Sequence, residues 1–165
     1  MTHGVTSHLD RTDTAWVAGL YPHLRSFASV VAPPHEDPND LVQEALMRAL
    51  RRGPLSQLEY PKAYLRTSIY HLAVSSRRRW AVQQKGLVQI AADVEPPEDP
   101  WQVEELLNLR PKARAVLYLR VVEGLSYDEI GDLLECTAVS ARKSASRAKR
   151  RLRRLLAEEV DDATA

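Results

Sequence analysis

The stretch 126-SYDEIGDLLECTAVSARKSASRAKRRL-152 decides the fold of the second half of this chain. Ser126 is followed three residues later by Glu129, the spacing of a capping box, so we expect a short helix over 127–134. A turn at 135–137 and a longer helix over about 138–158 follow. A short helix, a tight turn and a longer helix form the geometry that places the second helix in the major groove of DNA.

A preceding helix completes this unit. Pro111 suits the first turn of a helix, which we expect over 111–122, with a turn at 123–125 after it. The apolar residues expected in the core of this unit are Ala115, Leu117 or Val116, Leu119, Val122, Ile130, Leu133 and Leu134. The sequence therefore predicts a DNA-binding helix-turn-helix over about 109–156.

The long helix is strongly basic, with eight bases and no acid between Thr137 and Ala157. Small serines separate the bases, and small side chains let a backbone approach base edges while Arg and Lys contact phosphates or guanine. The alternative is a solvated basic face or a coiled-coil flank, but the preceding helix and turn favour DNA. Glu135 stands in the turn where such motifs often carry Gly, which is expected to cost some stability.

Composition limits the fold and the compartment. The 165 residues are 44% hydrophobic but only 6% aromatic, with six glycines, which favours small helical bundles built from Leu, Val and Ala. The single Cys136 excludes an internal disulfide and fits a reducing cytoplasm. We find no apolar run of membrane-spanning length and no signal-peptide core, so we expect a soluble protein without membrane insertion.

The first half is predicted to hold three helices. The first is capped by Asp13 or Thr14, and Pro22 is expected to kink or split it. The second runs over about 38–51 and the third from Pro61 to about residue 80. The expected core positions are Trp16, Leu20, Leu24, Phe27 and Val31, then Leu41, Val42, Ala45, Leu46, Ala49 and Leu50, then Ala63, Leu65, Ile69, Leu72 and Ala73.

An acidic segment separates the halves, with six acids and no base over 92–105. It is either a disordered spacer or a mimic of nucleic acid. The fold class expected is all-α, as two small helical bundles joined by a flexible acidic linker, the second containing the helix-turn-helix. The expected boundaries are a disordered tail at 1–11, a bundle at 12–80, a linker at 81–102, a bundle at 103–158 and a tail at 159–165.

Motifs in both halves resemble bacterial sigma factors of the two-domain extracytoplasmic-function (ECF) group. Residues 125–134 are similar to "LSYEEIAEIL", residues 136–152 to "CSVGTVKSRLHRARKRL", and residues 109–114 to "LPxxxR". In the first half, residues 40–49 are similar to "DLVQETFLRAW" and residues 61–74 to "PAAWLYRIARNLAID". The resemblance implies sigma regions two and four, and therefore a cytoplasmic, nucleoid-associated initiation factor that directs core RNA polymerase to promoter DNA. An anti-sigma factor is a further partner that it implies.

The resemblance also implies roles for single residues. The face that docks on the polymerase clamp carries Asp40, Gln43, Glu44 and Arg48. The minus-ten element would meet Tyr60, Tyr64, His71, Arg77, Arg78 and Arg79. The minus-thirty-five element would meet Ser140, Arg142, Lys143, Ser144, Arg147 and Arg150. A solvated helix face is the alternative for the first set, and core packing is the alternative for the two tyrosines.

The third helix differs from the family pattern at two positions, because the family's Asn and Asp are replaced here by His71 and Ser75. A neutral imidazole donates and accepts only in one tautomer, so base choice at minus ten is expected to differ or to depend on pH. The histidines are scattered without the spacing of a metal site, and no phosphate loop or nucleophile elbow occurs. We therefore expect no catalysis, no cofactor and no metal, and a polar loop at His35.

Other readings of the same residues stay open. The main alternative is a stand-alone helix-turn-helix regulator that does not act with core polymerase. A third is an interaction protein that sequesters partners through its first bundle.

Overall fold

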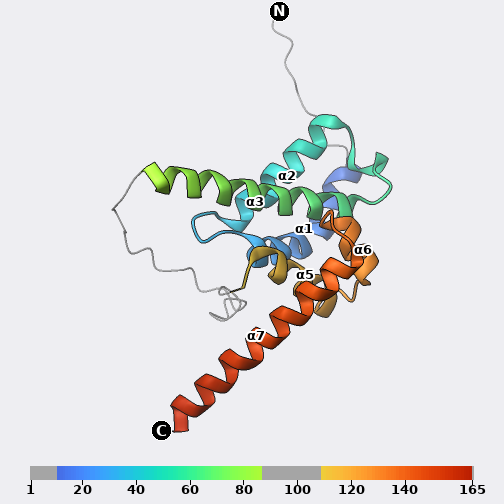
Figure 1. Ribbon diagram of the computed structural model, residues 1–165. Helices are drawn as coiled ribbons and strands as arrows, with labels where there is room; N and C mark the ends of the chain where they lie inside the picture. Colours follow the sequence, from blue (N-terminus) through green and yellow to red (C-terminus); the bar gives the residue numbers. More distant parts are fainter. Residues whose placement is uncertain (1–10, 87–108, 165) are drawn as a thin grey trace, which may run out of the picture.

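The computed structural model describes residues 11–86 and 109–164, and every regular element in these ranges is helical (Figure 1). The all-helical prediction is therefore confirmed for these ranges. The predicted N-terminal tail and most of the predicted linker lie outside the described residues. The elements are α1 (Arg11–Val31), α2 (Pro38–Arg52), the 3₁₀-helix η1 (Leu55–Gln57), α3 (Pro61–Gly86), α5 (Pro111–Val121), α6 (Tyr127–Leu133) and α7 (Ala138–Thr164).

The first helix differs from the expectation in three ways, and the first is that Trp16, expected in the core, is 42% exposed. α1 is one continuous helix with Pro22 inside it, so of the two expected effects of the proline, a kink or a split, the split does not occur. Its buried residues beyond the proline, such as Leu24 and Phe27, pack in the core and hold the helix together despite the missing N–H donor. Asp13 does not cap α1, which begins before it; its side chain is 2% exposed and accepts a hydrogen bond from the Leu55 amide at 2.9 Å.

Helices α2 and α3 form the rest of the first half. Asp37 caps α2 by accepting from the Asn39 amide, and the predicted apolar stripe is buried except for the half-buried Leu50. α3 begins at Pro61 as predicted but runs to Gly86, beyond the predicted end near residue 80. The other predicted core residues of α3 are buried, but Ala63 is exposed because it lies on a different face of the helix from them.

The second half confirms the helix-turn-helix. Ser126 and Glu129 make both hydrogen bonds of the capping box at the start of α6. Val122 is 50% exposed, contrary to prediction; it is the C-cap residue of α5, and with Val121 it lies beyond the buried residues 114–119 of that helix. In the turn before α7, Glu135 has a φ of 53°, a left-handed conformation that costs a non-glycine residue free energy.

The two halves pack against each other. α1 lies against α5 as well as against α2 and α3, and α6 lies beside α3, while the C-terminal part of α7 extends away (Figure 1). Thr67 Oγ1 donates to the Leu133 carbonyl at 3.0 Å, and Arg114 donates to the Ala32 carbonyl at 3.3 Å. We call this packing of α5 and α6 on α1 and α3 the closed arrangement. In this structure α1 therefore packs against helices of both halves.

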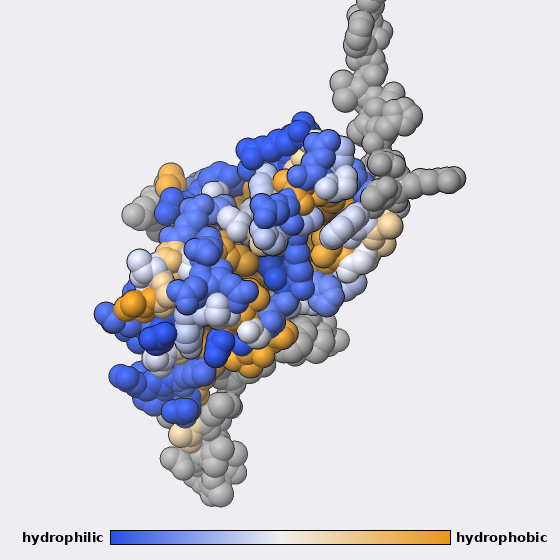
Figure 2. Space-filling model, turned by 90° about the vertical axis from the view of Figure 1, so that its right-hand side faces the viewer, coloured by the Kyte–Doolittle hydropathy of each residue, from blue (hydrophilic) through white to orange (hydrophobic). Residues whose placement is uncertain are grey.

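The surface is largely hydrophilic on the face that Figure 2 presents, with hydrophobic residues in smaller patches between the charged ones. The described helices include none that combines the length and hydropathy needed to cross a bilayer.

Candidate nucleic-acid interface

A basic groove runs between α5 and α7, with a volume of about 640 Å³. At the start of α7, Thr137 Oγ1 accepts a hydrogen bond from the Ser140 amide at 3.1 Å. Both residues line the groove. Four of the residues predicted to read the minus-thirty-five element line this groove, namely Ser140, Lys143, Ser144 and Arg147. Lys143 and Arg147 are exposed, so their charges are accessible to a polyanion.

Two other predicted readers lie outside the groove lining. Arg142 stacks over the Tyr127 ring at 5.4 Å, and Arg120 approaches the same ring at 5.1 Å. These cation–π contacts join α7 to α5 and α6, which gives Arg142 a structural role in the helix-turn-helix. Arg150 is exposed on α7.

The groove also contains bases that the sequence did not assign to a site. Arg110, the residue before α5, and Lys112 of α5 line it on one side, and Arg151 lines it from α7. Lys112 Nζ donates to Ser140 Oγ at 3.3 Å, so it bridges the two helices at the groove. Arg110 and Lys112 flank Pro111 in the stretch similar to "LPxxxR". Their positive charge was the only feature of the sequence that could have assigned them to a DNA-binding groove.

The tyrosines predicted at the minus-ten element differ in exposure. Tyr60 is 69% exposed just before α3, so its ring is free to stack on an unpaired base. Tyr64 is half-buried and accepts a hydrogen bond from Arg52 Nη1 at 3.1 Å. Tyr64 therefore combines packing against the core with an accessible polar end.

The remaining minus-ten candidates lie along α3. His71 Nε2 lies 3.2 Å from Glu135 Oε1, so the imidazole faces the turn of the helix-turn-helix. Arg78 and Arg79 are exposed, whereas Arg77 is half-buried and its pKa is lowered by burial. The structure thus separates two arginines that are open to solvent from one that lies in the packed region.

Arg77 lies near a second buried cation, Arg114 of α5. The side chain of Arg114 is 3% exposed, and burial together with the Arg77 charge lowers its pKa to about 10. Its Nε has no hydrogen-bond partner within the described ranges. The repulsion between these two guanidinium groups opposes the closed arrangement.

The predicted polymerase-docking residues share the outer face of α2. Asp40, Gln43 and Arg48 are exposed, and Glu44 is half-buried. Glu44 Oε1 accepts from Arg48 Nε at 2.6 Å, and this hydrogen bond is the main reason that the pKa of Glu44 is lowered. Met47, 49% exposed, adds an apolar contact surface on the same helix.

His35, in the loop before α2, contacts two residues of α3. Its Nε2 lies 3.1 Å from Ser76 Oγ, and its ring stacks on Trp80 at 5.0 Å. These two contacts join the loop before α2 to α3. They are compatible with the predicted polar loop.

Comparison with known proteins agrees with these features. The family model described as "Sigma-70, region 4" matches residues 103–152, which include α5, α6 and much of α7. No curated protein matches the chain. Among solved structures, the chain is similar to the sigma factor RpoE from Bartonella quintana, in a co-crystal structure with the anti-sigma factor NepR. The TM-score is 0.70 at 24% identity, over 89% of this chain and 98% of that chain.

The structural likeness at this level of identity concerns the fold, and it extends over both halves. The family model concerns the second half, where the structure has the capping box, the turn and the basic groove. Residues 103–152 therefore match the sigma-70 region 4 family model, and the chain as a whole has a fold similar to that of a sigma factor.

Proposed function

We propose that this protein is a non-enzymatic transcription initiation factor of the ECF sigma group, which binds core RNA polymerase in the cytoplasm and directs it to specific promoters. The observation that carries the proposal is the basic groove between α5 and α7 within a matched region 4 domain. A groove lined by exposed Lys143 and Arg147 beside small serines suits a DNA duplex.

The first half supports a second contact with the transcription machinery. The outer face of α2 keeps Asp40, Gln43 and Arg48 accessible in the closed arrangement, so a clamp-docking surface would be available there. Tyr60, Arg78 and Arg79 would then hold the opened strand at the minus-ten element, by stacking and by phosphate contacts. Region four would hold the minus-thirty-five duplex.

An anti-sigma factor is a further partner that we include in the proposal. The structural neighbour was crystallised with the anti-sigma factor NepR, and the likeness covers nearly all of that sigma factor. The proposed anti-sigma partner rests on this likeness of fold.

Run-off transcription with purified core polymerase and a library of bacterial genomic fragments tests the proposal. We expect discrete transcripts that need both the protein and the core enzyme. The double variant Gln43→Ala/Glu44→Ala should lose most of this activity and most of its affinity for core polymerase. Its matched control, Gln83→Ala/Asp132→Ala, removes the same two kinds of group from other exposed positions and should behave as wild type.

The same experiment separates the main alternative. A stand-alone helix-turn-helix regulator would bind duplex DNA tightly without core polymerase and would support no initiation. Folded protein that yields no core-dependent transcript from any fragment would contradict the proposal.

A further inference from the structure

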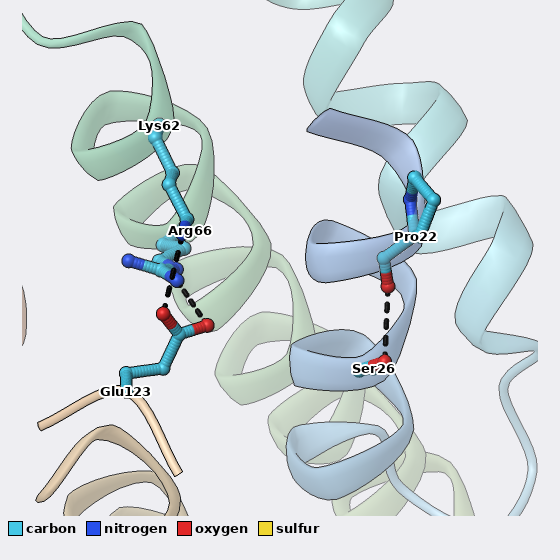
Figure 3. Close-up of polar contacts among 5 residues, drawn as sticks. All are labelled: Pro22, Ser26, Lys62, Arg66 and Glu123. Atoms are coloured by element: carbon cyan, nitrogen blue, oxygen red, sulfur yellow. Dashed lines mark hydrogen bonds and ion pairs between the residues drawn. The ribbon is translucent and has the colours of Figure 1, made fainter. Parts of the chain in front are cut away.

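Glu123, in the turn after α5, directs its carboxylate at two cations of α3 (Figure 3). Lys62 Nζ lies 3.2 Å from Glu123 Oε2, and Arg66 forms an ion pair with the other carboxylate oxygen. The side chains of Arg66 and Glu123 are only 4% and 11% exposed. The contact therefore joins the two halves of the chain in a place that is largely shielded from water.

The two cations form a site with a definite chemical preference. Lys62 and Arg66 are four residues apart on one helix, so they share a face. A phosphodiester carries one negative charge, as a carboxylate does, and both accept paired N–H donors from a guanidinium group. Arg66 Nε has no hydrogen-bond partner among residues 11–86 and 109–164, so the site has donor capacity that Glu123 does not use.

The same face of α3 makes further contacts with the second half. Thr67 donates to the Leu133 carbonyl, and His71 faces Glu135. The strip of α3 over 62–71 is therefore covered by the turn after α5 and by the helix-turn-helix. This strip belongs to the helix whose residues are the candidates for contact with an opened DNA strand.

We propose that Lys62 and Arg66 form a phosphate-binding pair for single-stranded DNA, and that Glu123 occupies this pair in the closed arrangement. The identification of the strand as promoter DNA rests on the function proposed above. Because the pair can hold one anion at a time, strand binding and the Glu123 contact exclude each other. The pattern "PAAWLYRIARNLAID" has Ala and Tyr at these two positions, so the resemblance itself assigns no role to the pair.

Fluorescence anisotropy with labelled oligothymidine and the full chain, without polymerase, tests the pair. Glu123→Gln should bind about tenfold more tightly than wild type, because two cations become available to phosphates. The slope of log K against log salt should become steeper by about 0.7, the value for one phosphate neutralised on a single strand, because the pair holds one phosphate. Asp132→Asn, the same charge change at an exposed position of α6, should keep the wild-type slope.

Adding Lys62→Gln and Arg66→Gln to Glu123→Gln should abolish both the gain and the steeper slope. Wild-type affinity in Glu123→Gln, or a gain that persists in the triple variant, would overturn the proposal.

If circular dichroism shows that Glu123→Gln does not fold, hydrogen exchange on the wild-type chain tests the proposal instead. Saturating oligothymidine should then slow exchange over 62–71 and speed it over 122–126, and unchanged exchange over 122–126 would overturn the proposal.

The two proposals can fail separately. Absence of core-dependent transcription together with the Glu123→Gln gain would reject the sigma-factor function and retain the phosphate-binding pair. Transcription together with wild-type affinity in Glu123→Gln would reject the pair alone.

Discussion

The rings of Phe27 and Tyr118 lie 5.8 Å apart with their planes inclined by 51°, and they join α1 of the first half to α5 of the second. Phe27 is fully buried and Tyr118 is nearly so. Burial raises the pKa of the Tyr118 hydroxyl, as expected for a phenol taken out of water. An aromatic pair of this kind adds to the apolar contact between the halves.

Replacing Phe27 should destabilise the whole chain. Phe27→Ala removes a large side chain that is 0% exposed, so the free energy of unfolding should fall by about 3–5 kcal/mol. Tyr60→Ala is the matched control, since Tyr60 is 69% exposed and its loss should change stability by less than about 0.5 kcal/mol. Urea denaturation measures both, and equal midpoints for the two variants would contradict the packing described.

Acid should weaken the closed arrangement through Glu123. Burial opposes the charged carboxylate, but the contacts with Arg66 and Lys62 outweigh it, so the pKa of Glu123 lies below its ordinary 4.5. A carboxyl with a lowered folded-state pKa stabilises the fold above its unfolded pKa, and this stabilisation disappears as the pH falls through the folded value.

The advantage of wild type over Glu123→Gln in unfolding free energy should therefore be constant near neutrality and shrink toward zero below pH 4.5. Glu44 and Glu129 also have lowered pKa values, but both proteins retain them, so their effects cancel in the difference. Denaturant midpoints across this range provide the measurement. A difference that does not vary with pH would count against the ion pairs.

Gly131 should tolerate no side chain. A Cβ there would lie 2.5 Å from the Cys136 carbonyl oxygen, where α6 meets the turn before α7. Gly131→Ala should cost about 1–3 kcal/mol and weaken binding to duplex DNA, because the turn must shift. Gly19→Ala is the control, since nothing lies within 4 Å of its Cβ and an alanine inside α1 should stabilise by about 0.5–1 kcal/mol. Thermal denaturation should move in opposite directions for the two variants.

Arg147 should contribute to DNA affinity through the groove. Arg147→Ala should weaken binding to a minus-thirty-five duplex by about 1–3 kcal/mol if the side chain reads a base. Lys149→Ala, at an exposed position that does not line the groove, should weaken binding less. Titrations with the cognate duplex and a scrambled one decide the role, because equal losses on both would make Arg147 a phosphate contact.

Local signals made much of the second half predictable from the sequence. The Ser126–Glu129 capping box and the turn before Ala138 depend on neighbouring residues, so they can be read directly from the chain. The stripe of α2 was predictable for the same reason, since its period is that of a helix.

Contacts between distant residues carried no such signal. Asp is a residue type that often caps helices, yet Asp13 accepts its hydrogen bond from the Leu55 amide, 42 residues away. Lys62 and Glu123 are 61 residues apart, and neither stands in a pattern that indicates an ion pair. The packing of the two halves likewise depends on apolar helix faces, and each such face could pack against several other helices. The closed arrangement could therefore not be derived from the helical periodicity of the apolar residues.

The dependence of promoter binding on core polymerase tests the central claim most directly. Footprinting of a promoter fragment with the full chain should show weak protection alone, and strong protection at both the minus-ten and minus-thirty-five elements once core enzyme is added. Gln43→Ala/Glu44→Ala should reduce the core-dependent protection at both elements together. Strong protection of a single duplex site without core enzyme, unchanged when core is added, would contradict the account.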